Sequence, residues 1–200
     1  MGLFPRRRCD NGKVARQWIC VFCGSSRTIK PVYAAAARQL GQALVQRELG
    51  LVYGGGATGL MGILADTVLE HGGEVIGVMP QALVSKEVVH RRLTRLHLVD
   101  SLEERKRLMS QLSNAFLALP GGFGTLDEVI TVLTAKILGL DDRPLALWNV
   151  AGYWNRFLEF LDYAVSEGMI RPWQRELLIE ETELSTLLER ILAARPAKIL

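Results

Sequence analysis

The chain alternates short apolar runs with longer segments of helical periodicity along most of its length. The apolar runs predict strands near residues 18–23, 49–53, 74–79, 95–99, 115–119 and 144–149, with a weaker one near 178–181. The helical patterns fall near 31–47, 60–71, 101–112, 125–138, 152–167 and 183–194. Because the predicted strands are continuous apolar runs, they are typical of a parallel sheet covered by helices on both faces. We therefore expect a single α/β domain with a doubly wound, Rossmann-like parallel sheet flanked by helices.

Composition supports one globular domain and separates it from a basic tail. Of the 200 residues, 49% are hydrophobic and 22% are charged, a mixture that can bury a core. Residues 1–16 hold five cationic side chains and one acid; with +3 for the whole chain, residues 17–200 sum to −1. We therefore expect a flexible basic tail over 1–16, a domain over 17–200 and no nucleic-acid partner. Without a membrane-length apolar run or a secretory signal pattern, we expect a cytoplasmic protein with no membrane partner.

Two of the three cysteines form a C-x-x-C pattern that must be weighed as redox or metal chemistry. Cys20 and Cys23 lie in an apolar run that reads as a strand, where positions three apart point to opposite faces. A redox pair gains its reactive thiolate at a helix N-terminus, and a zinc site would need a second ligand pair. We therefore predict buried structural thiols and no metal site.

Three loops that follow predicted strands carry the candidate chemistry: 24–26, 54–62 and 120–128. In a doubly wound fold, ligands bind beyond the carboxyl ends of the strands. Eight of the nineteen glycines lie in the last two loops. A tight strand-to-helix turn explains one glycine per loop, whereas triplets favour backbone amides that approach an anion such as phosphate. The candidate binding residues from these loops include Ser25, Gly54, Gly55 and Gly56.

Two classes of phosphate ligand are disfavoured because the chain lacks residues that they would need. Residues 54–59 match G-x-G-x-x-G, but the next predicted strand ends in Met79 and Pro80 rather than in the acid that would hold a dinucleotide ribose. No G-x-x-x-x-G-K-[ST] sequence occurs. Neither a dinucleotide cofactor nor a Walker-type nucleoside triphosphate is therefore favoured.

The helix near 101–112 begins with a capping-box pattern from Ser101 to Glu104. Its predicted apolar stripe consists of Leu102, Leu108, Met109 and Leu112. Arg105 falls near the middle of that stripe, and a buried cation needs a partner. Two interpretations stay open: an arginine that is paired with a structural carboxylate or extends to solvent, and an arginine aimed at a phosphate or substrate.

The loop at 120–128 also allows two interpretations. Thr125 and Glu128 have the spacing of a second capping box, which would make Glu128 a helix cap. Alternatively, Glu128 points away from the predicted core stripe and suits the far end of a bound nucleotide, near the ribose C1′. That stripe comprises Leu126, Val129, Ile130, Leu133 and Ile137. From the residues alone, the cap is slightly favoured.

Taken together, the motifs resemble those of the LOG (Lonely guy) family of phosphoribohydrolases, many of which were once labelled lysine decarboxylases. The resemblance runs from about Ile19 through Ile179. It rests on P-G-G-x-G-T-x-x-E at 120–128, the glycine loop at 54–62 and the Glu104-Arg105-Lys106 sequence. It implies hydrolysis of the N-glycosidic bond of a nucleoside 5′-monophosphate, a cytokinin nucleotide or AMP, to the free base and ribose 5-phosphate. It also implies a homodimer and no cofactor.

The resemblance assigns catalysis to Arg105 and Glu128. The substrate contacts that it implies are Glu87, Lys106, Gly122, Phe123, Gly124, Thr125, Leu126, Asp127 and Thr134. The implied chemistry agrees with the residues, since a carboxylate can stabilise an oxocarbenium-like ribose and activate water. Two departures are modest: Asp127 stands where the motif often has Glu, and residues 85–87 replace a Pro-Arg-Glu segment.

Three other functions are alternatives to this interpretation. Lysine decarboxylation would normally use a pyridoxal cofactor on a lysine, and the lysines beyond the tail (Lys30, Lys86, Lys106, Lys136 and Lys198) have no evident site for one. A non-catalytic carrier of a nucleotide or of the molybdenum cofactor would keep the glycine loops without needing Arg105 and Glu128. A nucleosidase acting on several bases is the rival within the enzyme class.

Overall fold

The computed structural model describes residues 17–84 and 88–194, which form one seven-stranded sheet and its covering helices. The strands are β1 (Trp18–Phe22), β2 (Gly50–Tyr53), β3 (Val75–Pro80), β4 (Arg95–Val99), β5 (Ala115–Ala118), β6 (Leu145–Trp148) and β7 (Leu178–Glu181). All neighbouring strands pair in parallel, in the order β4-β3-β2-β1-β5-β6-β7. The predicted strands and the doubly wound parallel sheet are confirmed.

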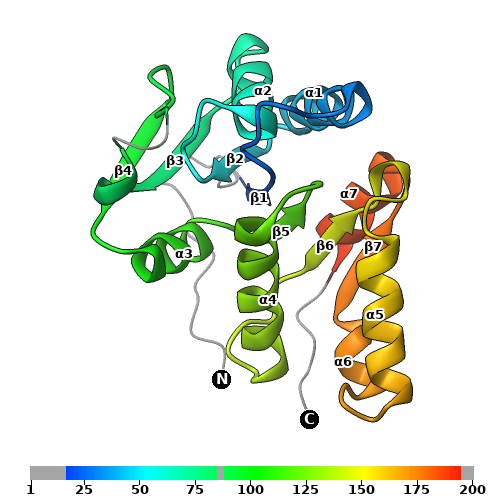
Figure 1. The fold of residues 1–200 in the computed structure, drawn as a ribbon. Helices are drawn as coiled ribbons and strands as arrows, with labels where there is room; N and C mark the ends of the chain where they lie inside the picture. Colours follow the sequence, from blue (N-terminus) through cyan, green and yellow to red (C-terminus); the bar gives the residue numbers. More distant parts are fainter. Residues whose placement is uncertain (1–16, 85–87, 195–200) are drawn as a thin grey trace.

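Helices cover both faces of this sheet. They are α1 (Pro31–Gln46), α2 (Gly59–Glu70), α3 (Leu102–Gln111), α4 (Phe123–Ile137), α5 (Asn155–Ser166), α6 (Pro172–Glu176) and α7 (Leu184–Ala193), with 3-10 turns η1 (Gln81–Leu83) and η2 (Val150–Gly152). Figure 1 shows α3, α4 and α5 on one face, while α1, α2 and α7 pack on the other. The short α6, which begins with a proline at its first turn, was not predicted from the sequence.

The two faces of the sheet build two hydrophobic cores. Alternate residues of β1 enter different cores: Ile19 and Val21 join α1, α2 and α7, while Cys20 and Phe22 join α3, α4 and α5. Cys23 belongs to the first core, so the two cysteines lie on opposite sides as predicted, and both are free and buried. The prediction of buried structural thiols is confirmed.

Two predicted core positions are wrong. Leu102 is the first residue of α3 and is 51% exposed, and Ile130 of α4 is 43% exposed. The buried face of α4 is rotated toward Val132 and Lys136. Lys136 can lie on that face because its ammonium donates to the Arg143 carbonyl oxygen at 2.6 Å, which satisfies one of its three donors.

The strand order places a topological switch point at the centre of the sheet. From β1 the chain builds β2, β3 and β4 outward on one side, then returns to add β5, β6 and β7 on the other. Directly beyond β1 and β5, the Gly24 amide donates to the Pro120 carbonyl at 3.1 Å. The crevice beside such a pair of diverging connections is where ligands bind in open α/β sheets. The fold therefore brings the loops at 24–26 and 120–128 together.

The basic segment 1–16 lies outside the described residues, so the expected tail stays a prediction. Within the described part of the chain, no helix has both the length and the apolar composition that a membrane crossing needs.

Candidate active site

A cavity of about 200 Å³ lies at the switch point, and we call it the switch-point cavity. It is lined by residues from all three glycine-containing loops and from α2 and α3: Val21, Cys23, Gly24, Ser25, Gly54, Met61, Arg105, Gly122, Phe123, Gly124, Thr125 and Glu128. Eight of the residues predicted for the site are therefore brought together. Their convergence was expected from the strand order, because each loop follows the carboxyl end of a parallel strand.

The glycines of the 120–124 turn have two different reasons to be glycine. A Cβ on Gly121 would lie 2.0 Å from the Thr125 hydroxyl oxygen and 3.0 Å from the Gly24 nitrogen, so the turn itself excludes a side chain there. A Cβ on Gly122 or Gly124 would meet nothing within 4 Å, and neither residue has a positive φ. Packing of the protein therefore does not require glycine at 122 or 124. Both positions instead leave open space in which a ligand can approach the backbone.

Helix α4 begins two residues earlier than predicted, which removes the capping interpretation of Glu128. The N-cap is Gly122, whose carbonyl accepts from the Leu126 amide at 3.0 Å, and no side chain caps this helix. Thr125 is thus in the first turn and buried, and Glu128 is in the second turn. The prediction of a Thr125–Glu128 capping box is wrong, because the glycine pair lets the backbone enter the helix before Thr125. The free first-turn amides of α4 line the cavity, where they can bind an anion.

Arg105 donates to two backbone carbonyls, one directly after β2 and one within β3. Its Nε donates to the Val78 carbonyl at 3.1 Å, and its Nη2 donates to the Gly54 carbonyl at 2.9 Å. A Cβ on Gly54 would lie 2.0 Å from Nη2, so this glycine admits the guanidinium. The positive charge is thereby fixed at the wall of the switch-point cavity. Of the two open interpretations, the one that directs Arg105 toward a ligand agrees with this position.

The predicted capping box at the start of α3 is confirmed in part. The Ser101 hydroxyl accepts from the Glu104 amide at 3.0 Å, as predicted. The Glu104 carboxylate, however, accepts from the amide of Asp100, one residue before the N-cap, at 3.0 Å.

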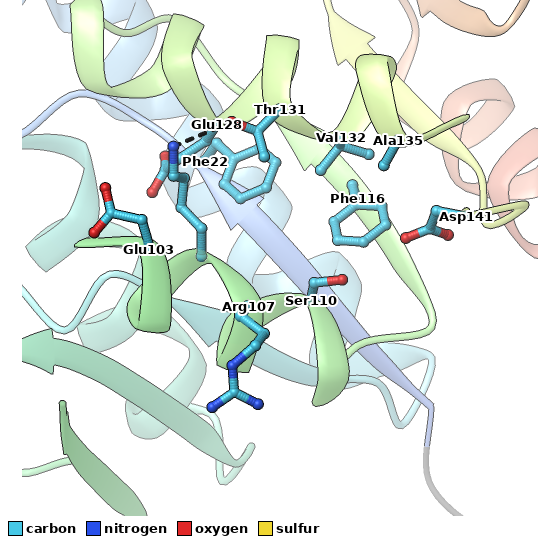
Figure 2. Close-up of a pocket in the computed structure, with 11 residues that line it drawn as sticks. Phe22, Glu103, Arg107, Ser110, Phe116, Glu128, Thr131, Val132, Ala135 and Asp141 are labelled. Atoms are coloured by element: carbon cyan, nitrogen blue, oxygen red, sulfur yellow. Dashed lines mark hydrogen bonds between the residues drawn. The ribbon is translucent and has the colours of Figure 1, made fainter. Parts of the chain in front are cut away.

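Glu128 stands between the switch-point cavity and a second, larger one. The second cavity, of about 350 Å³, lies between α3 and α4, and we call it the α3–α4 cavity. Figure 2 shows the Phe22 and Phe116 rings between the two helices, with Glu128 and Thr131 projecting from α4 and Ser110 from α3. The two rings stack with centroids 6.0 Å apart. Glu128 lines both cavities, so its carboxylate lies where a ligand that spans them would pass.

Lys106 and Asp127, both predicted as substrate contacts, pair with each other. The Lys106 ammonium donates to both carboxylate oxygens of Asp127 at 3.0 Å and to the Thr131 hydroxyl at 3.2 Å. This pair connects α3 to the second turn of α4 at the edge of the α3–α4 cavity, which Lys106 and Thr131 line. It therefore fixes the spacing of the helices that carry Arg105 and Glu128.

The remaining predicted contacts lie outside the switch-point cavity. Gly55, at φ 82°, packs near Met79 and Leu96, and Gly56 forms an isolated bridge with Val89. Leu126 packs against the core, and Thr134 is exposed on α4. Glu87 lies outside the described residues. Among the described residues, no group of three His, Cys, Asp or Glu side chains is placed to hold a metal ion.

Sequence reasoning missed several residues of the site. Val21, Cys23 and Met61 line the switch-point cavity although their types suggested only core positions. Tyr153, in the turn after β6, donates its hydroxyl to the Gly121 carbonyl at 2.6 Å. The only available signal was its place: the turn after β6 lies at the same edge of the sheet as the glycine loops.

The fold and its cavity define a class, the Rossmann-like α/β proteins with a ligand site at the sheet's switch point. A family model described as "Possible lysine decarboxylase" matches residues 61–191. The cytokinin riboside 5′-monophosphate phosphoribohydrolases LOG5 and LOG3 of Arabidopsis thaliana are each 43% identical to this chain. The LOG5 match covers 89% of this chain and 78% of LOG5, and the LOG3 match covers 86% and 80%. The chain belongs to this LOG family, as its motifs indicated.

Solved structures with the same fold are more distant in sequence. The molybdenum cofactor carrier protein of Chlamydomonas reinhardtii superposes with a TM-score of 0.68 at 20% identity, covering 90% of this chain and 99% of that chain. The molybdenum cofactor binding protein of Rippkaea orientalis gives 0.67 at 19% identity and covers 90% and 98%. At this identity the likeness shows the fold alone.

Proposed function

We propose that the chain hydrolyses the N-glycosidic bond of a purine nucleoside 5′-monophosphate, releasing the free base and ribose 5-phosphate. One observation carries the proposal: Glu128 lies at the junction of a glycine-lined cavity and an aromatic one. A nucleotide has its anion and its base at opposite ends, with the scissile C1′–N bond between them. The arrangement of cavities repeats that order, and the names of the Arabidopsis relatives describe the same reaction.

The phosphate end would bind at the start of α4. Amides at a helix N-terminus attract an anion through both their free hydrogens and the helix dipole. The absence of side chains at Gly122 and Gly124 leaves space for the phosphate oxygens to approach the backbone. Holding the phosphate there fixes the distance from C1′ to Glu128, one helical turn further along α4.

The bond-breaking step would rely on Glu128. As the C1′–N bond breaks, its electron pair goes to the base and positive charge develops on the ribose. A nearby carboxylate stabilises that charge. Water then adds to C1′, Glu128 takes the proton that the water loses, and the base is released protonated from solvent. Arg105, fixed by the carbonyls of Gly54 and Val78, would orient the ribose phosphate and balance the charges at the wall of the cavity.

The base would enter the α3–α4 cavity. Its volume of about 350 Å³ can hold a planar base, and its wall includes the apolar side chains of Phe22, Val132 and Ala135. An adenine fills only part of such a space, so an N6-prenyl group can follow the base into it. This supports a cytokinin nucleotide as the preferred substrate, with AMP turned over more slowly.

The experiment that tests the proposal is a product assay with three substrates. Purified protein is incubated with isopentenyladenosine 5′-monophosphate, AMP and adenosine, and the free base and ribose 5-phosphate are separated by chromatography. We expect base release from both nucleotides, faster from the prenylated one, and none from adenosine, which lacks the phosphate. If both nucleotides bind and stay intact, this result would contradict hydrolysis and favour the carrier alternative.

We also propose that the enzyme is a homodimer and acts in the cytoplasm. On α4, Val132 and Leu133 are buried in the core, whereas Leu138, at the C-cap of the helix, is 65% exposed. Leu138 continues a row on α4 that includes the exposed Ile130 and Thr134, one helical turn apart. This row supports contact between α4 helices of two copies.

A further inference from the structure

Tyr153 approaches the phosphate loop from a neighbouring connection of the sheet. It lies between η2 and α5, after β6, which is paired with β5. Its hydroxyl donates to the Gly121 carbonyl at 2.6 Å. Neither the motifs nor the catalytic scheme above uses this residue.

The turn that presents Tyr153 adopts an uncommon backbone conformation. Ala151 has φ 51° and ψ 32°, and Gly152 has φ 71°. A left-handed conformation is disfavoured for a residue with a Cβ, so other contacts must hold it. The Asn149 side chain supplies two: its oxygen accepts from the Trp154 amide at 2.8 Å, and its amide donates to the Asn155 side-chain oxygen at 2.7 Å.

The ring of Tyr153 is fixed from two sides. Tyr33 of α1 meets it edge-on at 5.6 Å between centroids, and Trp154 meets it edge-on at 5.1 Å. Trp154 is only 2% exposed and therefore anchors this contact in the core. The position of the hydroxyl follows from the position of the ring, because a phenol oxygen lies in the ring plane. The hydrogen bond to Gly121 is thus made by a pre-positioned donor.

The contact with Tyr153 acts on the cavity through the peptide group between Gly121 and Gly122. In a trans peptide the carbonyl of one residue and the amide of the next point in opposite directions, and the described chain has no cis peptide. The Gly121 carbonyl points to Tyr153, so the Gly122 amide points away from it. Gly122 lines the switch-point cavity, whereas Gly121 and Tyr153 do not.

We propose that Tyr153 is a positioning residue of the phosphate site: its hydroxyl holds the 121–122 peptide in the orientation that presents the Gly122 amide to the 5′-phosphate. The inference rests on the proposed function only in placing a phosphate at this loop. Neither glycine has a side chain to hold that peptide, and a Gly–Gly pair has wide conformational freedom. Tyr153 supplies the restraint from outside the loop.

The test compares Tyr153→Phe with Tyr33→Phe. The first removes the hydroxyl and keeps the ring contacts; the second removes a hydroxyl that makes no hydrogen bond within 17–84 and 88–194. Calorimetry gives the affinity of each protein for ribose 5-phosphate and for adenosine. We expect Tyr153→Phe to bind ribose 5-phosphate about fivefold more weakly, as the loss of one hydrogen bond predicts. Adenosine affinity, and both affinities of Tyr33→Phe, should stay at the wild-type values.

Other outcomes separate this inference from the proposed function. Tyr153→Phe that binds ribose 5-phosphate as tightly as wild type would overturn it, as would an equal loss of affinity for both ligands. A kinetic comparison with AMP should show the loss in KM with kcat retained, because the restraint acts on binding and not on Glu128. Wild-type protein that binds ribose 5-phosphate through Tyr153 and yet leaves nucleotides intact would contradict hydrolysis while supporting the positioning role.

Discussion

Arg105 illustrates how far single residues could be interpreted from the sequence. The helical spacing placed this cation on the buried side of its helix, which implied a partner. The partners are the carbonyls of Gly54, directly after β2, and of Val78, within β3. No pattern in the chain identifies a backbone carbonyl as a partner, because every residue has one. The position was therefore predictable, whereas the contact was not.

We predict that Arg105→Lys loses both activity and stability. A lysine has no planar fork to reach two carbonyls at once, so at least one of them is left unsatisfied. Leaving a buried acceptor unpaired costs about 1–3 kcal/mol. Base release from AMP and the free energy of unfolding in urea measure the two losses. Arg156→Lys on α5, where the Arg156 side chain is 91% exposed and lines neither cavity, is the matched control, and equal behaviour of the two variants would contradict the role of Arg105.

The two buried cysteines should resist alkylation in the folded protein. Burial is the largest cause that raises the pKa of the Cys20 and Cys23 thiols above the ordinary value, and the Glu128 carboxylate raises both further. A raised pKa keeps the thiol protonated, and only the thiolate reacts. We expect iodoacetamide at pH 8 to modify both only in denaturant, as peptide mass spectrometry will show. Rapid labelling of either in native protein would contradict their structural role.

At the scale of elements, helix α4 begins at a different residue from the one that its sequence motif predicts. The spacing of Thr125 and Glu128 matches a capping box, yet the helix begins at Phe123. Two glycines before a helix make its first turn hard to place, because glycine adopts many backbone conformations. Consequently the site could be located from the sequence, whereas the position of Glu128 within α4 could not.

The two glycines of this turn give a paired prediction. Gly121→Ala should destabilise the fold, since its Cβ would lie 2.0 Å from the Thr125 oxygen. Gly122→Ala should fold normally, because its Cβ meets nothing within 4 Å. Its affinity for ribose 5-phosphate should fall by about tenfold or more, because the new methyl group occupies the space of the phosphate. Thermal unfolding and calorimetry distinguish the variants. A Gly122→Ala protein with full affinity would argue against phosphate at this turn.

At the scale of the whole molecule, the continuous apolar runs were sufficient to predict the fold. The runs that became β2, β3, β5 and β6 are fully buried, as expected for parallel strands covered on both faces, whereas the edge strand β4 is mostly exposed. What the sequence could not provide is distance between separate elements. The α3–α4 cavity lies between two separate helices, and the Tyr153–Gly121 contact joins residues 32 positions apart. Glu87 and the basic segment 1–16 stay predictions, since both lie outside the described residues.

The quaternary structure gives a prediction at the same scale. We expect sedimentation to yield twice the chain mass of 22.2 kDa. Leu138→Glu should shift the protein toward monomer, because a charge would enter the apolar row on α4. Leu192→Glu on α7, where Leu192 is 41% exposed, is the control and should leave the dimer intact. A wild-type monomer would contradict the proposed assembly.

The central claim is that Glu128 breaks the glycosidic bond of a nucleotide held by the start of α4. The most direct measurement compares wild type with Glu128→Gln, which keeps the shape of the side chain and removes its charge. We predict that base release from isopentenyladenosine 5′-monophosphate falls by at least about a hundredfold, while ribose 5-phosphate affinity and thermal unfolding stay at wild-type values. Base release at the wild-type rate by Glu128→Gln would contradict the account.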